Sequence, residues 1–145
     1  MGFGTVKIVV ANENLMPYKK YDKDAGWDLK ANIESPVTIC PGEILSVGTG
    51  IKIAIPVGYV GDIRPRSGLA SKGVAAQYGT IDPNYRGEIG ITLINTGNKA
   101  YTIHPLERVA QLVIVKIALV SELHAVPELP ESDRDDGGFG HTGRF

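Results

Sequence analysis

The stretch Val113-Ile114-Val115-Lys116-Ile117-Ala118-Leu119-Val120 is a nearly unbroken run of apolar, mostly β-branched residues. Such a run is typical of a strand that is covered on both faces. Two earlier stretches, Ile51-Lys52-Ile53-Ala54-Ile55 and Glu88-Ile89-Gly90-Ile91-Thr92-Leu93, alternate apolar residues with polar or small ones. Alternation with a period of two indicates strands with one buried face. Together these stretches predict an all-β fold.

Turn-forming residues separate the expected strands at short and regular intervals, at Pro41-Gly42, Gly48–Gly50, Pro56–Gly58, Asp82–Asn84 and Asn95–Asn98. The chain of 145 residues contains 18 Gly and 9 Pro, which disfavours a helical bundle. Short strands between regular turns favour a sandwich, a jelly roll or a small barrel. Only Ser67–Lys72 could form a helix, of one or two turns, with Ser67 as its N-cap.

The charge balance of the chain disfavours some classes of function. The length fits one domain, and 15 basic against 16 acidic residues leave a formal net charge of −1. A nucleic-acid binder of this size is usually basic, so we expect no nucleic-acid and no membrane partner.

No apolar run approaches the roughly 20 residues of a membrane span, and the apolar N-terminal run is too short for a signal peptide. The single cysteine, Cys40, fits a reducing compartment and is expected to be a small buried apolar residue. We therefore expect a cytoplasmic protein.

The character of the chain changes after Val126. The segment Pro127–Asp136 is charged and contains prolines, and Gly137–Phe145 is rich in glycine. Neither can bury enough apolar area to offset the entropy of ordering it. We therefore divide the chain into a β domain, residues 1–126, and a flexible C-terminal arm, residues 127–145, that orders when it binds something.

Three segments carry residues suited to phosphate or acid–base chemistry. Arg66-Ser67-Gly68 offers a guanidinium fork beside free backbone N–H groups. In the expected hairpin Gly79–Gly87, Asp82 could act as a base and Tyr85 as a flat wall. Asp28 is a lone acid in an apolar strand, which requires a cationic partner, either Arg66 or Arg108. The histidines show no metal-ligand spacing.

Five segments resemble, in the same order along the chain, the five motifs of the trimeric dUTPase family (deoxyuridine 5'-triphosphate nucleotidohydrolases). They are Ala25–Ala31, Pro65–Gly73, Gly79–Gly87, Glu107–Leu112 and the glycine-rich arm. The resemblance implies an antiparallel β-barrel of jelly-roll type, a homotrimer with active sites at subunit interfaces, and a swapped arm that closes over a neighbour's site. It also implies hydrolysis of dUTP to dUMP and pyrophosphate with Mg²⁺ on the triphosphate. This activity would limit uracil incorporation into DNA and supply dUMP for thymidylate synthesis.

The resemblance also implies roles for individual residues. Asp82 would activate the water that attacks the α-phosphorus in line, and Tyr85 would pack on the deoxyribose. Backbone groups of Gly79, Thr80 and Ile81 would read uracil, with any contact from Ala76 made through backbone or water. Asp28 would act near metal-bound waters without being a direct ligand. Phosphate and base contacts would come from Arg66, Ser67, Gly68, Gln111, Arg134, Phe139 and Gly140.

Two departures from the family pattern lie in the arm and in a turn. Asp135 and Asp136 follow Arg134 where many members have Gly, and Leu106 replaces the usual Gly before Glu107. Three alternative functions remain. A dCTP deaminase, or a bifunctional deaminase–diphosphatase, is disfavoured because Val74–Tyr85 contains no glutamate. The others are a non-catalytic nucleotide-sensing or protein-binding member of the fold and an unrelated structural jelly roll.

Overall fold

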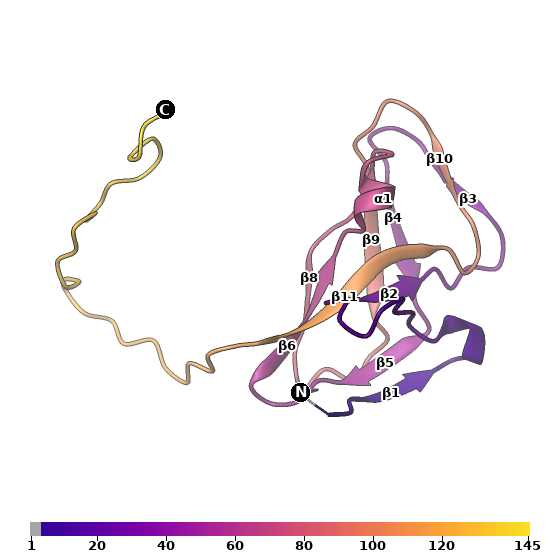
Figure 1. Ribbon diagram of the computed structural model, residues 1–145, viewed down its shortest axis with the longest axis horizontal. Coiled ribbons are helices and arrows are strands. Elements are labelled where there is room, and N and C mark those ends of the chain that lie inside the picture. Colours follow the sequence, from indigo (N-terminus) through magenta and orange to yellow (C-terminus); the bar gives the residue numbers. More distant parts are fainter. Residues whose placement is uncertain (1–3) are drawn as a thin grey trace.

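The computed structural model describes residues 4–145 and consists almost entirely of β-strands (Figure 1). The described helices are a short 3-10 turn, η1 (Glu13–Leu15), and one turn of α-helix, α1 (Ser67–Ala70). The strands are β1 (Lys7–Val10), β2 (Trp27–Lys30), β3 (Val37–Ile39), β4 (Ile44–Gly48), β5 (Ile51–Ala54), β6 (Tyr59–Arg64), β7 (Val74–Ala76), β8 (Gly79–Ile81), β9 (Gly90–Asn95), β10 (Tyr101–Ile103) and β11 (Arg108–Lys116).

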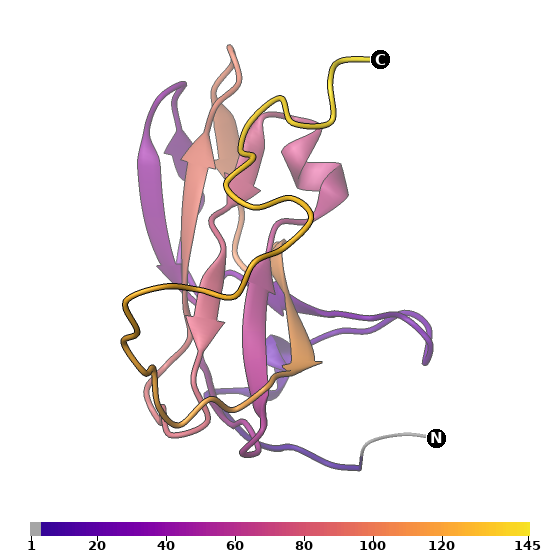
Figure 2. The same cartoon turned by 90° about the vertical axis from the view of Figure 1, so that its left-hand side faces the viewer.

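All strand pairs are antiparallel. The larger sheets have the orders β2-β11-β6-β8 and β4-β9-β7, and β1 pairs with β5 and β10 with β3. Many neighbours in a sheet are far apart in sequence, as in a jelly roll. The sheets wrap around one interior, with α1 at one end (Figure 2). The fold is therefore the antiparallel, all-β, jelly-roll-type barrel that the sequence predicts.

Apolar side chains from every sheet fill this interior. Leu29 on β2, Ile39 on β3, Ile51 on β5, Leu93 on β9 and Ile103 on β10 are each at most 1% exposed. Alternating strand residues point to opposite faces, so each strand contributes every second side chain to the core. The barrel is thus held together mainly by branched aliphatic side chains.

One buried polar side chain links several loops to this core. Asn95 is fully buried, and its Nδ2 donates hydrogen bonds to the carbonyl oxygens of Ile39 and Lys99. Its Oδ1 accepts a hydrogen bond from the Gly97 amide at 2.9 Å. Because its donors and acceptor are all used, Asn95 can be buried without leaving an unpaired polar group.

The structure refines the expected strands. Ile51–Ala54 forms β5 as predicted, and the expected strand Glu88–Leu93 lies two residues further along, as β9. The strand predicted at Val113–Val120 is only partly correct, because β11 begins at Arg108 and ends at Lys116. The last paired residues are Lys116 and Tyr59, where β6 begins, so the apolar residues after Lys116 have no strand beside them in the described chain.

Two local expectations are wrong. Ser67 is the first residue of α1 rather than its N-cap, which is Arg66 in an extended conformation, and α1 ends at Ala70 rather than Lys72. Cys40 is exposed. It directly follows Ile39, which points into the core at the end of β3, so alternation turns the Cys40 side chain outward.

The chain leaves the barrel after β11. The Ile117 amide donates to the Gly58 carbonyl at 2.9 Å, and almost every residue from Ala118 onward is exposed. Figure 1 shows this segment extending away from the sheets. It carries apolar side chains that the barrel does not cover, including Leu119, Leu123 and Leu129, which are 69%, 93% and 83% exposed. In residues 4–145, no helix has the length and apolar character needed to cross a membrane.

Candidate active site

The register of β11 brings Asp28 and Gln111 to one face of the four-stranded sheet. Gln111 lies opposite Asp28 on β2 and opposite Arg64 on β6. Directly opposed residues of an antiparallel pair point to the same side of the sheet. The carboxylate of Asp28 and the amide of Gln111 therefore project together.

A β-bulge adds Arg108 to this face. Arg108 precedes Gln111 by three residues, so in a regular strand the two would point to opposite faces. The register against β2 shifts between Arg108 and Ala110, which makes Val109 an extra residue and reverses the direction of Arg108. Arg108 Nη1 reaches Asp28 Oδ2 at 3.2 Å, and its guanidinium lies 4.8 Å from the centre of the Tyr18 ring.

Arg66 holds the same carboxylate from the other side. It lies between the end of β6 and the start of α1, and its Nε is 3.1 Å from Asp28 Oδ1. Its Nη1 donates to the Arg108 carbonyl at 2.8 Å. The expectation that Asp28 needs a cationic partner is confirmed, and both candidate arginines fill that role.

The Gln111 side chain is fixed by backbone on two sides. Its Nε2 donates to the Pro65 carbonyl at 3.0 Å, which ties β11 to the segment that carries Arg66. A Cβ atom at Gly26 would overlap the Gln111 side-chain amide. Gly26 is therefore required by a close approach rather than by a turn.

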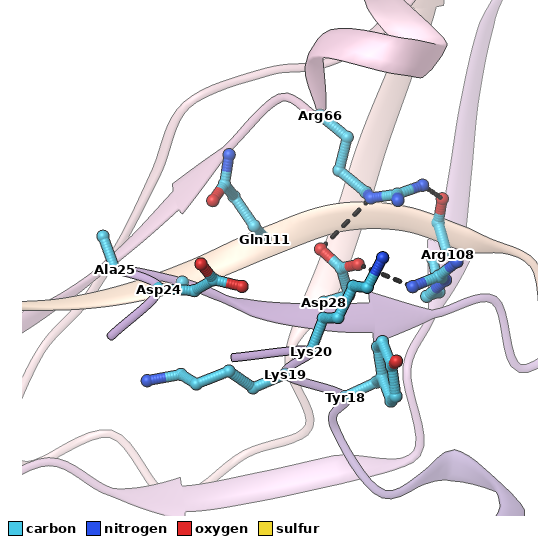
Figure 3. Close-up of a pocket in the computed structure, with 10 residues that line it drawn as sticks. Tyr18, Lys19, Lys20, Asp24, Ala25, Asp28, Arg66, Arg108 and Gln111 are labelled. Atoms are coloured by element: carbon cyan, nitrogen blue, oxygen red, sulfur yellow. Dashed lines mark hydrogen bonds and ion pairs between the residues drawn. The ribbon is translucent and has the colours of Figure 1, made fainter. Parts of the chain in front are cut away.

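These side chains line an open cavity of about 490 Å³ (Figure 3). Its lining includes four cationic residues, Lys19, Lys20, Arg66 and Arg108, and two acidic ones, Asp24 and Asp28. An excess of positive charge in a concave surface attracts anions. The cavity is suited to a ligand that carries several negative charges.

Tyr101 lies close enough to Glu107 and to Arg66 to interact electrostatically with both. Partial burial raises the pKa of the Tyr101 phenol above its usual value, and the Glu107 carboxylate, which accepts a hydrogen bond from it, raises it further, against the opposing effect of Arg66. Tyr101 therefore remains a neutral donor near pH 7. Glu107 Oε2 is buried and has no hydrogen-bond partner among residues 4–145.

Ser67 and Gly68 lie beside Arg66 in the first turn of α1, and both are exposed. Leu69 is 5% exposed and anchors this turn in the core. The buried Leu69 therefore fixes the segment while Ser67 and Gly68 face solvent next to the cavity.

The Asp82 segment is not the hairpin that the sequence suggested. β8 pairs with β6, whereas β9 pairs with β4 and β7, so residues 82–89 connect two different sheets. Asp82 is exposed, and its carbonyl accepts from the Tyr85 amide at 3.1 Å. The Tyr85 hydroxyl donates to the Glu88 carbonyl at 2.9 Å, which orients a ring that is 44% exposed.

Gly79, Thr80 and Ile81 form β8, at the edge of the four-stranded sheet. Ala76, at the end of β7, is 4% exposed and directs its methyl group into the core. Only the backbone of Ala76 is therefore available for a ligand contact.

The remaining candidates lie on the arm. Arg134 Nε donates to the Gly137 carbonyl, at 2.6 Å, so the arm forms a small curl around its own arginine. Phe139 is fully exposed, and Gly140 has a positive φ of 81°. Figure 1 shows this curl far from the barrel.

One chain thus brings together Asp28, Arg66 and Gln111, with Ser67 and Gly68 alongside, but it leaves the Asp82–Tyr85 loop and the arm outside the cavity. The site predicted from the sequence does not include Arg108 or Lys20. Arg108 is predicted only as a partner of Asp28, because the bulge that redirects it has no clear sequence signal. Three lysines in Lys19–Lys23 were the available signal for Lys20.

Among residues 4–145, no group of three or more His, Cys, Asp or Glu side chains is placed to hold a metal ion. Asp28 uses both oxygens in ion pairs, yet each carboxylate oxygen can accept more than one hydrogen bond. Mg²⁺ commonly keeps several waters and binds through substrate phosphates with few protein ligands. The chain therefore fits a Mg²⁺ ion that arrives on a phosphate ligand, and Asp28 has acceptor capacity left for hydrogen bonds from waters of such an ion.

The sequence matches the dUTPase family over residues 4–143. It is 43% identical over 144 residues to the deoxyuridine 5'-triphosphate nucleotidohydrolase of Fusobacterium nucleatum subsp. nucleatum, covering 96% of this chain and 98% of that protein. It is 46% identical over 143 residues to the protein of the same name from Syntrophotalea carbinolica, covering 96% of this chain and 97% of that protein.

Solved structures agree with the sequence matches. The dUTPase of Staphylococcus bacteriophage 80alpha with dUpNHpp superposes with a TM-score of 0.87 at 30% identity, covering 97% of this chain and 99% of that one. A dUTPase mutant from phage phi11 of S. aureus, described as revealing the coordination of a structural Mg(II) ion, has a TM-score of 0.76 at 29% identity and covers 86% of this chain and 98% of that one. The chain therefore belongs to the dUTPase family.

Proposed function

We propose that this protein hydrolyses dUTP to dUMP and pyrophosphate in a homotrimer whose active sites combine residues from several subunits. The observation that carries this proposal is the cavity in which Asp28 is clamped between Arg66 and Arg108, next to Gln111. It offers an oriented, positively charged site for a polyphosphate. Membership of the dUTPase family is the reason for proposing dUTP as that polyphosphate.

The trimer explains why the candidate residues are separated in one chain. The phosphate-side residues surround one cavity, the Asp82–Tyr85 loop connects two other strands, and the arm extends away from the barrel. A site that is complete only when three such parts meet requires other copies of the chain. The exposed leucines at positions 119, 123 and 129 give the segment after β11 an apolar surface that a neighbouring subunit could bury.

In this mechanism Asp82 accepts a proton from the attacking water, and that water forms its bond to the α-phosphorus in line with the departing pyrophosphate. The Tyr85 ring, held through its hydroxyl by the Glu88 carbonyl, packs on the deoxyribose and leaves no room for a 2′-hydroxyl. A positioned carboxylate base typically contributes 10²–10⁴-fold to such a reaction.

Arg66, Ser67, Gly68 and Gln111 contact the phosphates, and Arg134 and Gly140 of the arm complete these contacts while Phe139 stacks on uracil. Phosphoryl transfer depends mainly on positioning and charge stabilisation, so a preformed guanidinium cluster fits this chemistry. When bound, Mg²⁺ neutralises charge on the triphosphate and on the pyrophosphate leaving group. Asp28 would accept hydrogen bonds from waters of that ion while keeping Arg66 in place.

Selectivity for uracil would come from the backbone of β8. Uracil presents O4 as an acceptor and N3–H as a donor, and cytosine presents the opposite pattern. Backbone groups of Gly79, Thr80 and Ile81, with that of Ala76, would pair with uracil and leave cytosine with unpaired polar groups. A polar site of this kind discriminates by about 10⁴ or more in rate.

The biological consequence of the activity would be less uracil incorporated into DNA and more dUMP available for thymidylate synthesis, in the cytoplasm. Both the role and the location are predictions from the sequence.

Pyrophosphate release from dUTP, dTTP, UTP and dCTP, measured side by side, tests the proposed function. We expect hydrolysis of dUTP at least about 10³-fold more efficient, in kcat/KM, than that of the others. Ammonia release from dCTP would instead identify the deaminase. Binding of dUTP without turnover of any of the four nucleotides would identify a non-catalytic sensor.

A further inference from the structure

The turn before β2 carries a cation that none of the predicted roles uses. The Tyr18 amide and carbonyl pair with Asp28, so Tyr18 and Asp28 lie opposite each other on the same face. Lys19 and Lys20 follow Tyr18 in the turn before β2, and both line the cavity. Lys19 Nζ lies over the Trp27 ring, 4.6 Å from its centre, so Lys19 already has an aromatic partner.

Lys20 lines the cavity that also contains the Asp28 carboxylate (Figure 3). The two oxygens of that carboxylate are already used by Arg66 and Arg108. Lys20 forms no ion pair with any side chain of residues 4–145, and its described contact is with the Tyr21 ring, 5.1 Å away. Asp24, the other acid of the cavity, accepts the Tyr21 amide through Oδ2.

The cavity therefore holds Arg66 and Arg108 on one carboxylate, and Lys20 without an anionic partner among residues 4–145. Positive charges in one cavity repel one another, and an anion that enters the cavity relieves this repulsion. A nucleoside monophosphate would bring one phosphate group, whereas a polyphosphate brings several along the length of the cavity.

We propose that Lys20 is an additional polyphosphate-binding residue that contacts the pyrophosphate portion of the substrate rather than the nucleoside or its α-phosphate. This proposal rests on the proposed function, because it assigns a part of the substrate to one side of the same cavity. A charge-assisted hydrogen bond from a lysine to a phosphate oxygen strengthens binding by about tenfold or more. Lys20 therefore sets the preference of the site for triphosphate over monophosphate.

Calorimetric binding of pyrophosphate and of dUMP, each with Mg²⁺, to the full-length protein tests this assignment. We expect Lys20→Ala to weaken pyrophosphate binding about tenfold and to change dUMP binding less than about twofold. Lys20→Arg keeps the charge and should restore most of the pyrophosphate affinity. Lys23→Ala is the matched control, because Lys23 is an exposed lysine of the same turn that does not line the cavity.

The assignment is overturned if Lys20→Ala binds pyrophosphate as the unmodified protein does, or if it loses pyrophosphate and dUMP affinity equally, which would mark a structural role. It is also overturned if the unmodified protein binds no pyrophosphate. Failure to hydrolyse dUTP would count against the proposed function instead, since the pyrophosphate comparison can still be read in an inactive protein.

Discussion

Asp28 is the residue on which the geometry of the cavity depends. Its side chain is 21% exposed and joins two guanidinium groups from separate segments, one before α1 and one on β11. Burial of an acid in an apolar strand made a cationic partner predictable from the sequence. The use of both arginines was not predictable, because it depends on a bulge and on the path of the chain after β6.

We expect Asp28→Asn to destabilise the protein by about 1–3 kcal/mol, because it removes two charge-assisted interactions and leaves two cations together. Activity should also fall, since Arg66 loses the partner that holds it. Thermal unfolding and steady-state hydrolysis measure the two effects. Asp62→Asn is the control, because the Asp62–Arg64 pair lies on a more exposed part of the sheet and should change stability by less than about 1 kcal/mol. Equal losses in the two variants would show that the cluster has no special role.

Asp82→Asn should leave dUTP binding nearly unchanged and lower kcat by about 10²–10⁴-fold, because Asn retains the shape but cannot accept the proton of the attacking water. Rapid-mixing hydrolysis gives the rate, and titration with a non-hydrolysable analogue gives the affinity. Asp22→Asn, an exposed acid in another turn, is the control. Near-normal turnover of Asp82→Asn would remove this residue from the mechanism.

At the scale of elements, the barrel depends on close contacts between connections as well as on paired strands. Gly73, between α1 and β7, has a φ of +94°, and a Cβ there would come within 2.8 Å of the Gly97 Cα. The two connections therefore touch through their backbones. This contact positions α1, and with it the Arg66–Gly68 segment, against the end of β9.

Gly73→Ala should destabilise the protein by more than about 1 kcal/mol, because alanine is strained at positive φ and the methyl group has no space. Chemical denaturation measures the change. Gly90→Ala is the matched control, since its nearest neighbour would be the Val47 carbonyl oxygen at 4.0 Å. If Gly73→Ala is as stable as Gly90→Ala, the contact between the connections is not tight in solution.

A strand could be predicted from the sequence where apolar and polar residues alternate regularly, as in β5. The end of β11 could not be predicted, because the β-branched run continues after the strand pairing has stopped. The sequence pattern predicts that residues 117–120 are buried, whereas Ala118, Leu119 and Val120 are exposed in the described chain. The exposed Cys40 was missed for a related reason, because side-chain direction at a strand end depends on one residue of register.

At the scale of the whole molecule, the fold class and the phosphate-side cluster could be predicted from the sequence. The arrangement of the remaining parts could not, since in the proposed trimer the Asp82 loop and the arm meet only between chains. A resemblance to known motifs assigns roles one residue at a time. It gives no distance between those residues within a single chain.

Deleting Pro130–Phe145 should leave a folded trimer with little activity, because the barrel core involves no residue of this segment. Sedimentation gives the assembly state, and steady-state hydrolysis gives the rate. Full activity of the shortened protein would make the arm a passive tail.

Mixing two inactive variants tests directly whether one active site combines the Asp82 loop of one chain with the arm of another. Shortened subunits and Asp82→Asn subunits, each nearly inactive alone, should regain part of the activity when refolded together, because some mixed sites then contain an intact loop and an intact arm. Trimers of each variant refolded separately and then combined without exchange are the control. Activity that stays at the level of that control would place the loop and the arm in the same chain.

In the proposed trimer, the point at which the chain leaves the barrel, after Lys116, would tie turnover to protein concentration. A newly synthesised subunit would have its own cavity, but its arm would complete the site of a neighbouring subunit. Dilution below the trimer dissociation constant would silence the enzyme without unfolding it. Output would then rise more steeply than the amount of protein made, so a modest change in expression would act as a threshold.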